Sequence, residues 1–193
     1  MQMTNQIPDE LWHENESYVI LQGPAKLGFD PIDYAMWPIG LSTANHRGYW
    51  CDYAVADGGM LTLEKLSINS RTGYYPPING VKPSAPRLVK AKMERWNGKG
   101  FETVVEDVLS NRGYHFYDNL RLALRYSGRI MLGRTREAWL CTGYLFPPVW
   151  AFREVFELAF EDGLLVDAAD ISWQFTEERA RRIERKLERF SDG

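Results

Sequence analysis

Four turn dipeptides divide the middle of the chain and limit the folds that it can adopt. Asp57-Gly58, Asn97-Gly98, Ser127-Gly128 and Asp162-Gly163 each lie between stretches of alternating or continuous apolar residues. Asn-Gly and Asp-Gly supply the positive φ angles of tight reversals, so the pattern predicts antiparallel strands joined as hairpins. We therefore expect an α+β fold: a β-rich antiparallel sheet or partly closed meander built from hairpins, with two helices.

The first of these hairpins has a predictable register. Residues 49–55 alternate between two faces, as a strand with one buried side does. A three-residue loop at Asp57-Gly58-Gly59 places Val55 opposite Leu61 and joins two apolar faces. Further along, the apolar residues change phase, which predicts a bulge near Glu64-Lys65.

Other apolar stretches also read as strands. Ser17 to Gly23 is a short apolar run ended by Gly23-Pro24, and Val89 to Met93 alternates with charged residues. Between them, the proline-rich and glycine-rich residues 69–86 form the longest expected loop. A three-residue turn through Ser127-Gly128 would set Tyr126 opposite Ile130 in a further hairpin.

Residues 152–161 fit both helical and strand spacing. We prefer a hairpin here because Asp162-Gly163 is followed directly by Leu164-Leu165-Val166, and a helix from Pro148 to Glu161 is the alternative.

Two helices complete the prediction. Apolar residues recur at i, i+3, i+4, i+7 and i+8 from Phe101, and Gly113 is placed to end a helix at about 101–111. At the other end, Thr176 precedes two glutamates as an N-cap, which predicts a helix at about 177–190.

Composition places this chain in a broad class. Its 193 residues are 45% hydrophobic, enough for a core, and we expect one domain over 1–193. No apolar run reaches the roughly 20 residues of a membrane helix, and the start is polar, so we expect a cytoplasmic protein without a membrane partner. Cys51 and Cys141 lie in apolar stretches and are expected to be buried thiols.

Charge is unevenly distributed along the sequence. Residues 81–136 contain 12 Lys/Arg and 5 Asp/Glu, whereas residues 137–173 contain 1 and 7. Basic strands lying beside acidic ones explain this best, because opposite charges commonly pair across strands. A charged face for a partner is the alternative.

A polar loop before the first alternating strand offers the strongest concentration of reactive side chains. Ser42, Asn45, His46 and Arg47 could converge on an anionic or carbonyl-bearing ligand. Ser42 and His46 are too close in sequence to imply a nucleophile and its base, and we expect the loop to be structural. His13 and His115 are isolated, so we expect neither a metal nor a cofactor.

Partner binding is supported by aromatic and basic residues. Tyr74 and Tyr75 precede two prolines, and Phe146 and Trp150 flank two more, in loops where aromatics often anchor partners. Arg121, Arg125 and Arg129 belong to a basic strip suited to phosphate or to an acidic protein. The overall acidity of the chain argues against nucleic acid.

The stretch Leu41 to Trp50, followed by Gly59-Met60-Leu61-Thr62-Leu63, resembles a group of small uncharacterised bacterial proteins. Their shared pattern is Ser-Thr, then Arg-Gly-Tyr, a strand, a glycine turn and a Leu-x-Leu strand. The resemblance implies a β-rich fold and a bacterial or phage-like origin, with no activity to transfer.

We expect a non-enzymatic protein-binding domain, such as an immunity protein, an inhibitor or a subunit of a bacterial defence assembly. Its partner would be another protein, for example one encoded by a neighbouring gene. The alternatives are a small enzyme or ligand-binding protein that uses the Ser42–Arg47 loop, and RNA binding through the arginine-rich hairpin.

Overall fold

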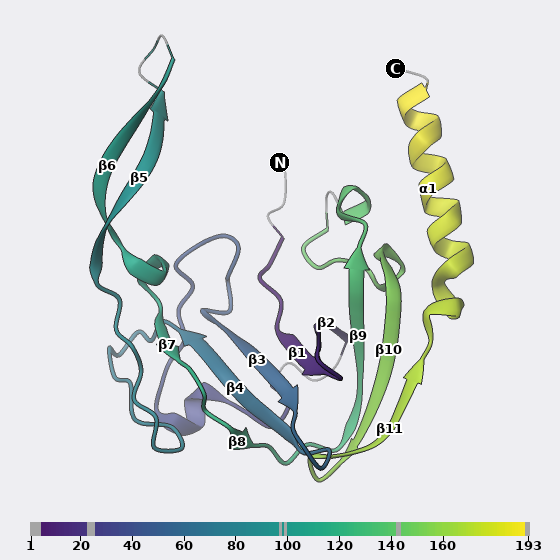
Figure 1. The fold of residues 1–193 in the computed structure, drawn as a ribbon, viewed down its shortest axis with the longest axis horizontal. Coiled ribbons are helices and arrows are strands. Elements are labelled where there is room, and N and C mark those ends of the chain that lie inside the picture. Colours follow the sequence, from purple (N-terminus) through teal and green to yellow (C-terminus); the bar gives the residue numbers. More distant parts are fainter. Residues whose placement is uncertain (1–4, 23–25, 97, 99, 142–143, 192–193) are drawn as a thin grey trace.

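A nine-stranded mixed sheet forms the body of the protein (Figure 1). The computed structural model describes residues 5–22, 26–96, 98, 100–141 and 144–191. Neighbouring strands follow the order β11-β10-β9-β2-β1-β3-β4-β7, and β8 also pairs with β4. The strands are β1 (Glu10–His13), β2 (Glu16–Gln22), β3 (Tyr49–Val55), β4 (Leu61–Ile68), β7 (His115–Tyr117), β8 (Leu122–Ala123), β9 (Gly128–Arg136), β10 (Phe152–Glu161) and β11 (Leu164–Asp170). The β-rich α+β class is confirmed.

The middle of the sheet is built by the N-terminal hairpin. β1 lies parallel to β3 and antiparallel to β2, and β2 pairs with β9. The β1–β2 turn uses Glu14 and Asn15, whose φ angles are 51° and 63°. Because these residues are not the usual Asn-Gly or Asp-Gly pair, the turn signal is weak and the sequence did not predict β1.

The curled sheet closes at one end, where two hairpin turns meet. Met60 and Leu164 form an antiparallel bridge there. The amide of Leu61 donates to the carbonyl of Gly163, and the amide of Leu165 donates to that of Gly59, each at 2.8 Å. The outer strand β11 is thereby joined to the start of β4, which agrees with the predicted partly closed meander.

The main apolar core lies on one face of this curved sheet. Leu11, Tyr53, Leu132 and Leu158 are each at most 1% exposed and come from strands spread across it. The irregular segment 26–41, which contains the short helix η1 (Pro31–Tyr34), buries three further apolar side chains in the same cluster.

A second apolar cluster covers part of the sheet near β9 and β10. It joins Leu140, Cys141, Phe152 and Val155 to half-buried residues of the C-terminal segment, including Ile183. The helix α1 (Thr176–Ser191) therefore packs on the body through its first turns, as Figure 1 shows. A helix at about 177–190 is confirmed. The Thr176 hydroxyl, however, donates back to the carbonyl of Ser172.

The predicted register of the β3–β4 hairpin and the predicted hairpin at Asp162-Gly163 are both confirmed. Val55 lies opposite Leu61, and Glu64 is left between the pairs Tyr53↔Leu63 and Asp52↔Lys65, which is the expected bulge. β10 and β11 pair antiparallel around Asp162-Gly163. The strand interpretation of 152–161 is therefore right and the helix alternative is wrong.

The predicted internal helix at 101–111 is wrong. These residues form β6 (Phe101–Leu109), which pairs along its length with β5 (Leu88–Trp96) in a separate two-stranded sheet. The β-branched pair Val104-Val105 suits a strand, and the apolar spacing that suggested a helix also fits two alternating faces. Of the turn, Asn97 lies outside the described residues, while Gly98 has a φ of 91°.

The hairpin predicted through Ser127-Gly128 is also wrong. β8 pairs with β4, whereas β9 pairs with β2 and β10, so Tyr126 does not pair with Ile130. The carbonyl of Tyr126 instead accepts from the amide of Gly163. Both segments bury their apolar faces, and alternation cannot show which neighbours a strand will take.

Three further sequence predictions concern the strand at residues 17–23, the loop at residues 69–86 and membrane-spanning helices. β2 confirms the first apolar strand, although Gly23-Pro24 lies outside the described residues. A long loop separates β4 from β5, as expected. Within the described part of the chain, no helix is both long and apolar enough to cross a membrane.

Candidate partner-binding surface

The segment of the chain that connects β9 to β10 carries a group of exposed apolar side chains. Trp139, Tyr144, Leu145 and Phe146, which we call the aromatic rim, are 39%, 39%, 40% and 64% exposed. Trp139 lies in η3 (Ala138–Cys141), and the other three lie in the proline-rich stretch before η4 (Val149–Ala151). Of these four, the sequence interpretation named Phe146 alone, although the other three flank the same aromatic and proline-rich segment.

The aromatic rim is held by packed side chains beneath it. The Trp150 ring meets Tyr144 edge-on at 5.8 Å between centroids, and the Arg182 guanidinium lies 5.2 Å from the Trp150 ring centre. Lys186 lies 5.4 Å from the Trp139 ring centre and donates to its backbone carbonyl. Trp150 thus supports Tyr144 through their edge-on contact and is itself held by the cation–π contact from Arg182 of α1.

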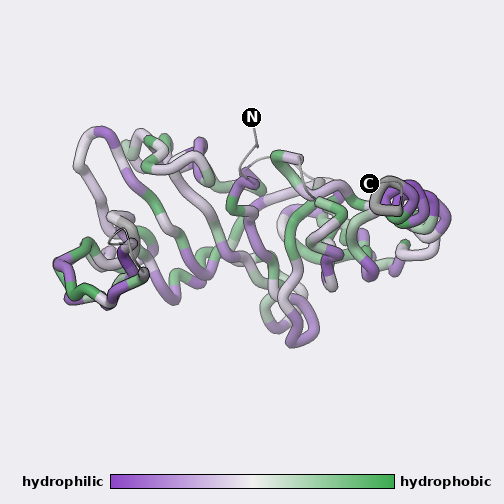
Figure 2. The backbone as a smooth tube through the Cα atoms, turned by 90° about the horizontal axis from the view of Figure 1, so that it is seen from above, coloured by the Kyte–Doolittle hydropathy of each residue, from purple (hydrophilic) through white to green (hydrophobic). Residues whose placement is uncertain are grey.

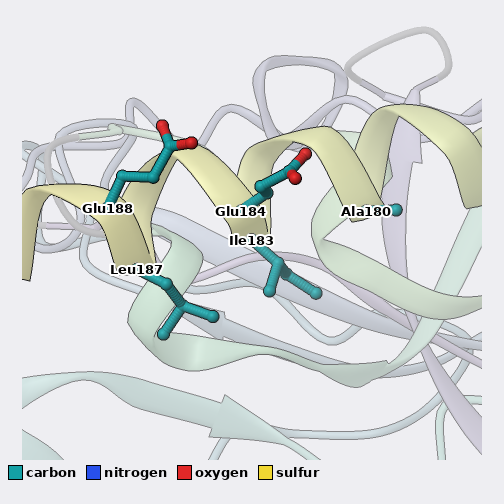
Figure 3. Close-up of a pocket in the computed structure, with 5 residues that line it drawn as sticks. All are labelled: Ala180, Ile183, Glu184, Leu187 and Glu188. Atoms are coloured by element: carbon teal, nitrogen blue, oxygen red, sulfur yellow. The ribbon is translucent and has the colours of Figure 1, made fainter. Parts of the chain in front are cut away.

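A hollow of about 680 Å³ lies against α1 (Figure 3). Ala180, Ile183 and Leu187 form its apolar lining, and Glu184 and Glu188 stand at its side. Leu187 is 56% exposed, so the apolar stripe of α1 continues past its packed first turns. The hollow is lined by α1 alone, and α1 also supplies Arg182 and Lys186, which contact Trp150 and Trp139.

The N-terminal segment joins the aromatic rim to the polar loop. The amide of Gln6 donates to the carbonyl of Leu145, and the side chain of Gln6 donates to Thr43 and accepts from the amide of His46. Two regions that are a hundred residues apart in sequence are therefore bridged by one glutamine. The structure brings two of the predicted candidate loops to the same end of the molecule.

Within the polar loop, Arg47 has a structural partner that the sequence did not reveal. Its guanidinium forms a two-pronged ion pair with Asp9, at 2.8 Å for one of the two contacts, and donates to the carbonyl of Tyr49. Asp9 also accepts from the amide of Cys51 at 2.8 Å. Burial raises the pKa of Tyr49 to about 12, although nearby Arg47 opposes the shift. Arg47 therefore ties the N-terminal segment to β3.

The remaining polar-loop candidates also serve the backbone. Ser42 and Asn45 form a backbone bridge, and the Asn45 side-chain oxygen accepts from the amide of Gly48 at 3.0 Å. Asn45 is only 3% exposed. These contacts shape a turn, as Ser and Asn side chains commonly do in loops, and they offer no nucleophile and base in contact.

Tyr74 and Tyr75 lie elsewhere, beside β7. Tyr75 stacks on His115 with 3.6 Å between ring centres, and its hydroxyl accepts from the amide of Ser70. Tyr74 is 54% exposed. Tyr75 therefore covers a sheet edge, while Tyr74 remains accessible to a partner.

The arginine candidates are spread over different partners. Arg129 pairs with Glu157 across β9 and β10, and the neighbouring Arg134 pairs with Glu154 at 2.6 Å. The predicted pairing of basic strands with acidic ones is confirmed for these two positions. Arg125 lies 4.0 Å from Asp162 with a largely exposed side chain, and the Arg121 carbonyl accepts from Asn79.

Burial shifts the pKa values of both cysteines and of His115. Cys51 and Cys141 are buried and free, and burial raises the pKa of each thiol. Desolvation by burial lowers the pKa of His115. Across the described ranges, no group of three or more His, Cys, Asp or Glu side chains is placed to hold a metal ion.

Comparisons of the chain with protein-family models, with curated proteins and with solved structures gave no match. The resemblance seen at residues 41–63 therefore stays a prediction from sequence.

Proposed function

We propose that this protein is a non-enzymatic protein-binding domain that contacts its partner through the aromatic rim, with the hollow on α1 as a second contact. It is of the kind that serves as an immunity protein, an inhibitor or a subunit of a bacterial defence assembly. The observation that carries the proposal is the set of four large apolar side chains, 39–64% exposed, of which Trp139 and Tyr144 contact supporting side chains.

Such an arrangement suits recognition of another protein. Aromatic anchors near the centre of an interface commonly provide most of its binding energy, and anchors that are already ordered lose less entropy on binding. The hollow along Ala180, Ile183 and Leu187 could accept an apolar side chain from the partner, with Glu184 and Glu188 in the polar surround.

The other two hypotheses receive less support. The side chains of Asn45 and Arg47 hold Gly48 and Asp9, which leaves Ser42 and His46 as the side chains for an active site in this loop. Arg129 and Arg134 are neutralised by carboxylates, which leaves less positive charge for RNA.

Affinity for the product of a neighbouring gene tests the proposal. Each candidate is purified and titrated by calorimetry against the wild type and against Phe146→Ala. We expect Phe146→Ala to weaken binding by about thirtyfold or more, the usual effect of removing an interface anchor.

Trp173→Ala is the matched control, because Trp173 is 74% exposed but lies in η5 (Ser172–Phe175), outside the rim. It should leave affinity unchanged. Equal loss from both variants, or full binding by Phe146→Ala, would rule out the rim as the contact surface.

A further inference from the structure

The β5–β6 hairpin forms an arm that extends from the body (Figure 1), and Figure 2 views this arm end-on. Within the described residues, its strands hydrogen-bond to each other in a sheet of their own. A lone two-stranded hairpin is marginally stable in water. This arm nevertheless exposes five large apolar side chains: Leu88, Trp96, Phe101, Val105 and Leu109 at 68%, 59%, 72%, 57% and 53%.

All five lie on the same face of the arm. Leu88 is opposite Leu109, Lys92 opposite Val105, and Trp96 opposite Phe101, and positions two apart along a strand share a face. The Trp96 and Phe101 rings meet edge-on at 5.2 Å, which confirms their common side. We call this side the pad face.

The pad face carries one apolar pad at each end. Trp96 and Phe101 form the tip pad, and Leu88 and Leu109 form the base pad. Leu41 of the body and Leu109 of the base pad both lie near Gly113, since a Cβ placed there would be 3.2 Å from Leu41 and 3.8 Å from Leu109. Between the pads lie charged residues, among them Lys90, which pairs with Asp107 at 3.4 Å, and Glu94.

This order of residues is self-complementary about its centre. Along β5, Lys92 is the midpoint, with Lys90 and Glu94 on either side and Leu88 and Trp96 at the ends. If two arms stack face to face and antiparallel around a two-fold axis at Lys92, each tip pad meets the other base pad. Each Lys90 then lies across from Glu94 of the other copy.

We propose that the pad face is a dimerisation surface whose partner is the arm of a second copy of this chain. Symmetric contacts between equal patches are the commonest way for soluble chains to associate. The right-handed twist of the ribbon would let the two arms coil about each other while the pad faces stay in contact.

Pairing through strand edges fits less well than stacking. A two-fold edge contact would place β5 beside β5 or β6 beside β6. An edge contact would leave the five exposed apolar side chains of each pad face uncovered, whereas stacking covers them. In the stacked register the two Lys92 side chains lie on either side of the axis.

Cross-linking tests the face and the register together. Lys92→Cys places a thiol next to the two-fold axis, so a short bis-maleimide should join two chains in high yield at low protein concentration. Met93→Cys is the control, since Met93 is the next residue and points to the opposite face. The native cysteines are buried. Cross-linking of Met93→Cys with none for Lys92→Cys would overturn the proposal.

Charge exchange provides a second test, read by sedimentation equilibrium. The wild type should have twice the chain mass. Lys90→Glu and Glu94→Lys should each dimerise about tenfold more weakly alone, because each faces a like charge across the axis. An equal mixture should recover most of the affinity. A monomeric wild type, or a mixture no tighter than either variant alone, would overturn the proposal.

The dimer proposal and the proposed function can be refuted independently of each other. Phe146→Ala should leave sedimentation unchanged, and the arm variants should leave affinity for the partner protein unchanged. A wild type that is monomeric but whose partner binding depends on Trp96 would assign the arm to that partner instead.

Discussion

The closure of the sheet makes one glycine unusually sensitive to substitution. Gly163 has a φ of +86°, and a Cβ at this position would lie 2.0 Å from the backbone oxygen of Leu124. Its amide donates to the carbonyl of Tyr126, and its carbonyl accepts from the amide of Leu61, each at 2.8 Å. Gly163→Ala must therefore shift the turn at the point where the two halves of the sheet meet.

The cost follows from two contributions. A left-handed φ costs alanine about 1 kcal/mol relative to glycine. Relief of the clash displaces two backbone hydrogen bonds, each contributing about 1 kcal/mol. We expect Gly163→Ala to lower the free energy of unfolding by about 3 kcal/mol, which for a chain of this size lowers Tm by about 6–12 °C.

Gly58→Ala is the matched control for this substitution. Gly58 has a φ of +84° in the adjoining turn, and a Cβ there would meet nothing within 4 Å. Gly58→Ala should therefore lower the free energy of unfolding by only about 1 kcal/mol, the cost of the left-handed φ. Urea unfolding followed by tryptophan fluorescence measures both variants. Equal destabilisation by the two substitutions would refute the reasoning, because it would show that Gly163 is not held against Leu124.

Three further outcomes are expected. Arg47→Ala leaves the Asp9 carboxylate, with only 12% of its side chain exposed, without its main partner, and should lower the free energy of unfolding by about 3 kcal/mol in urea titration. Hydrogen bonds from Thr135 and Arg134 lower the pKa of Glu154. Its stabilisation is therefore present above the unfolded pKa and lost as the pH falls through the folded one. The stability gap between wild type and Glu154→Gln should narrow as the pH falls below about 4.5, and a gap that is unchanged between about pH 7 and about pH 2 would contradict this. Neither cysteine should react with a thiol reagent until denaturant is added, and fast labelling of the native protein would contradict their burial.

Local signals predicted the hairpins whose turns directly join two paired strands. The Asp57-Gly58-Gly59 turn and the alternation before it were enough for the β3–β4 register, including its bulge. The same reasoning failed at Ser127-Gly128, because the flanking segments pair with strands from distant parts of the chain. For the candidate site, Phe146 was recognisable as an aromatic in a proline-rich loop. The roles of Asp9 and Gln6 depend on contacts with residues about 40 or more positions away.

By itself, the sequence determined which residues are apolar, the turns at Asp57-Gly58 and Asp162-Gly163, and the helix at 177–190, since these depend on side-chain chemistry and neighbours within a few positions. Tertiary structure decided the strand order, the closure at Gly163 and the separation of the β5–β6 arm from the sheet. Those features depend on which of several compatible strand edges meet, and burial across the whole sheet selects among them. For residues 101–109, pairing with β5 overrode a helical spacing that was equally present in the sequence.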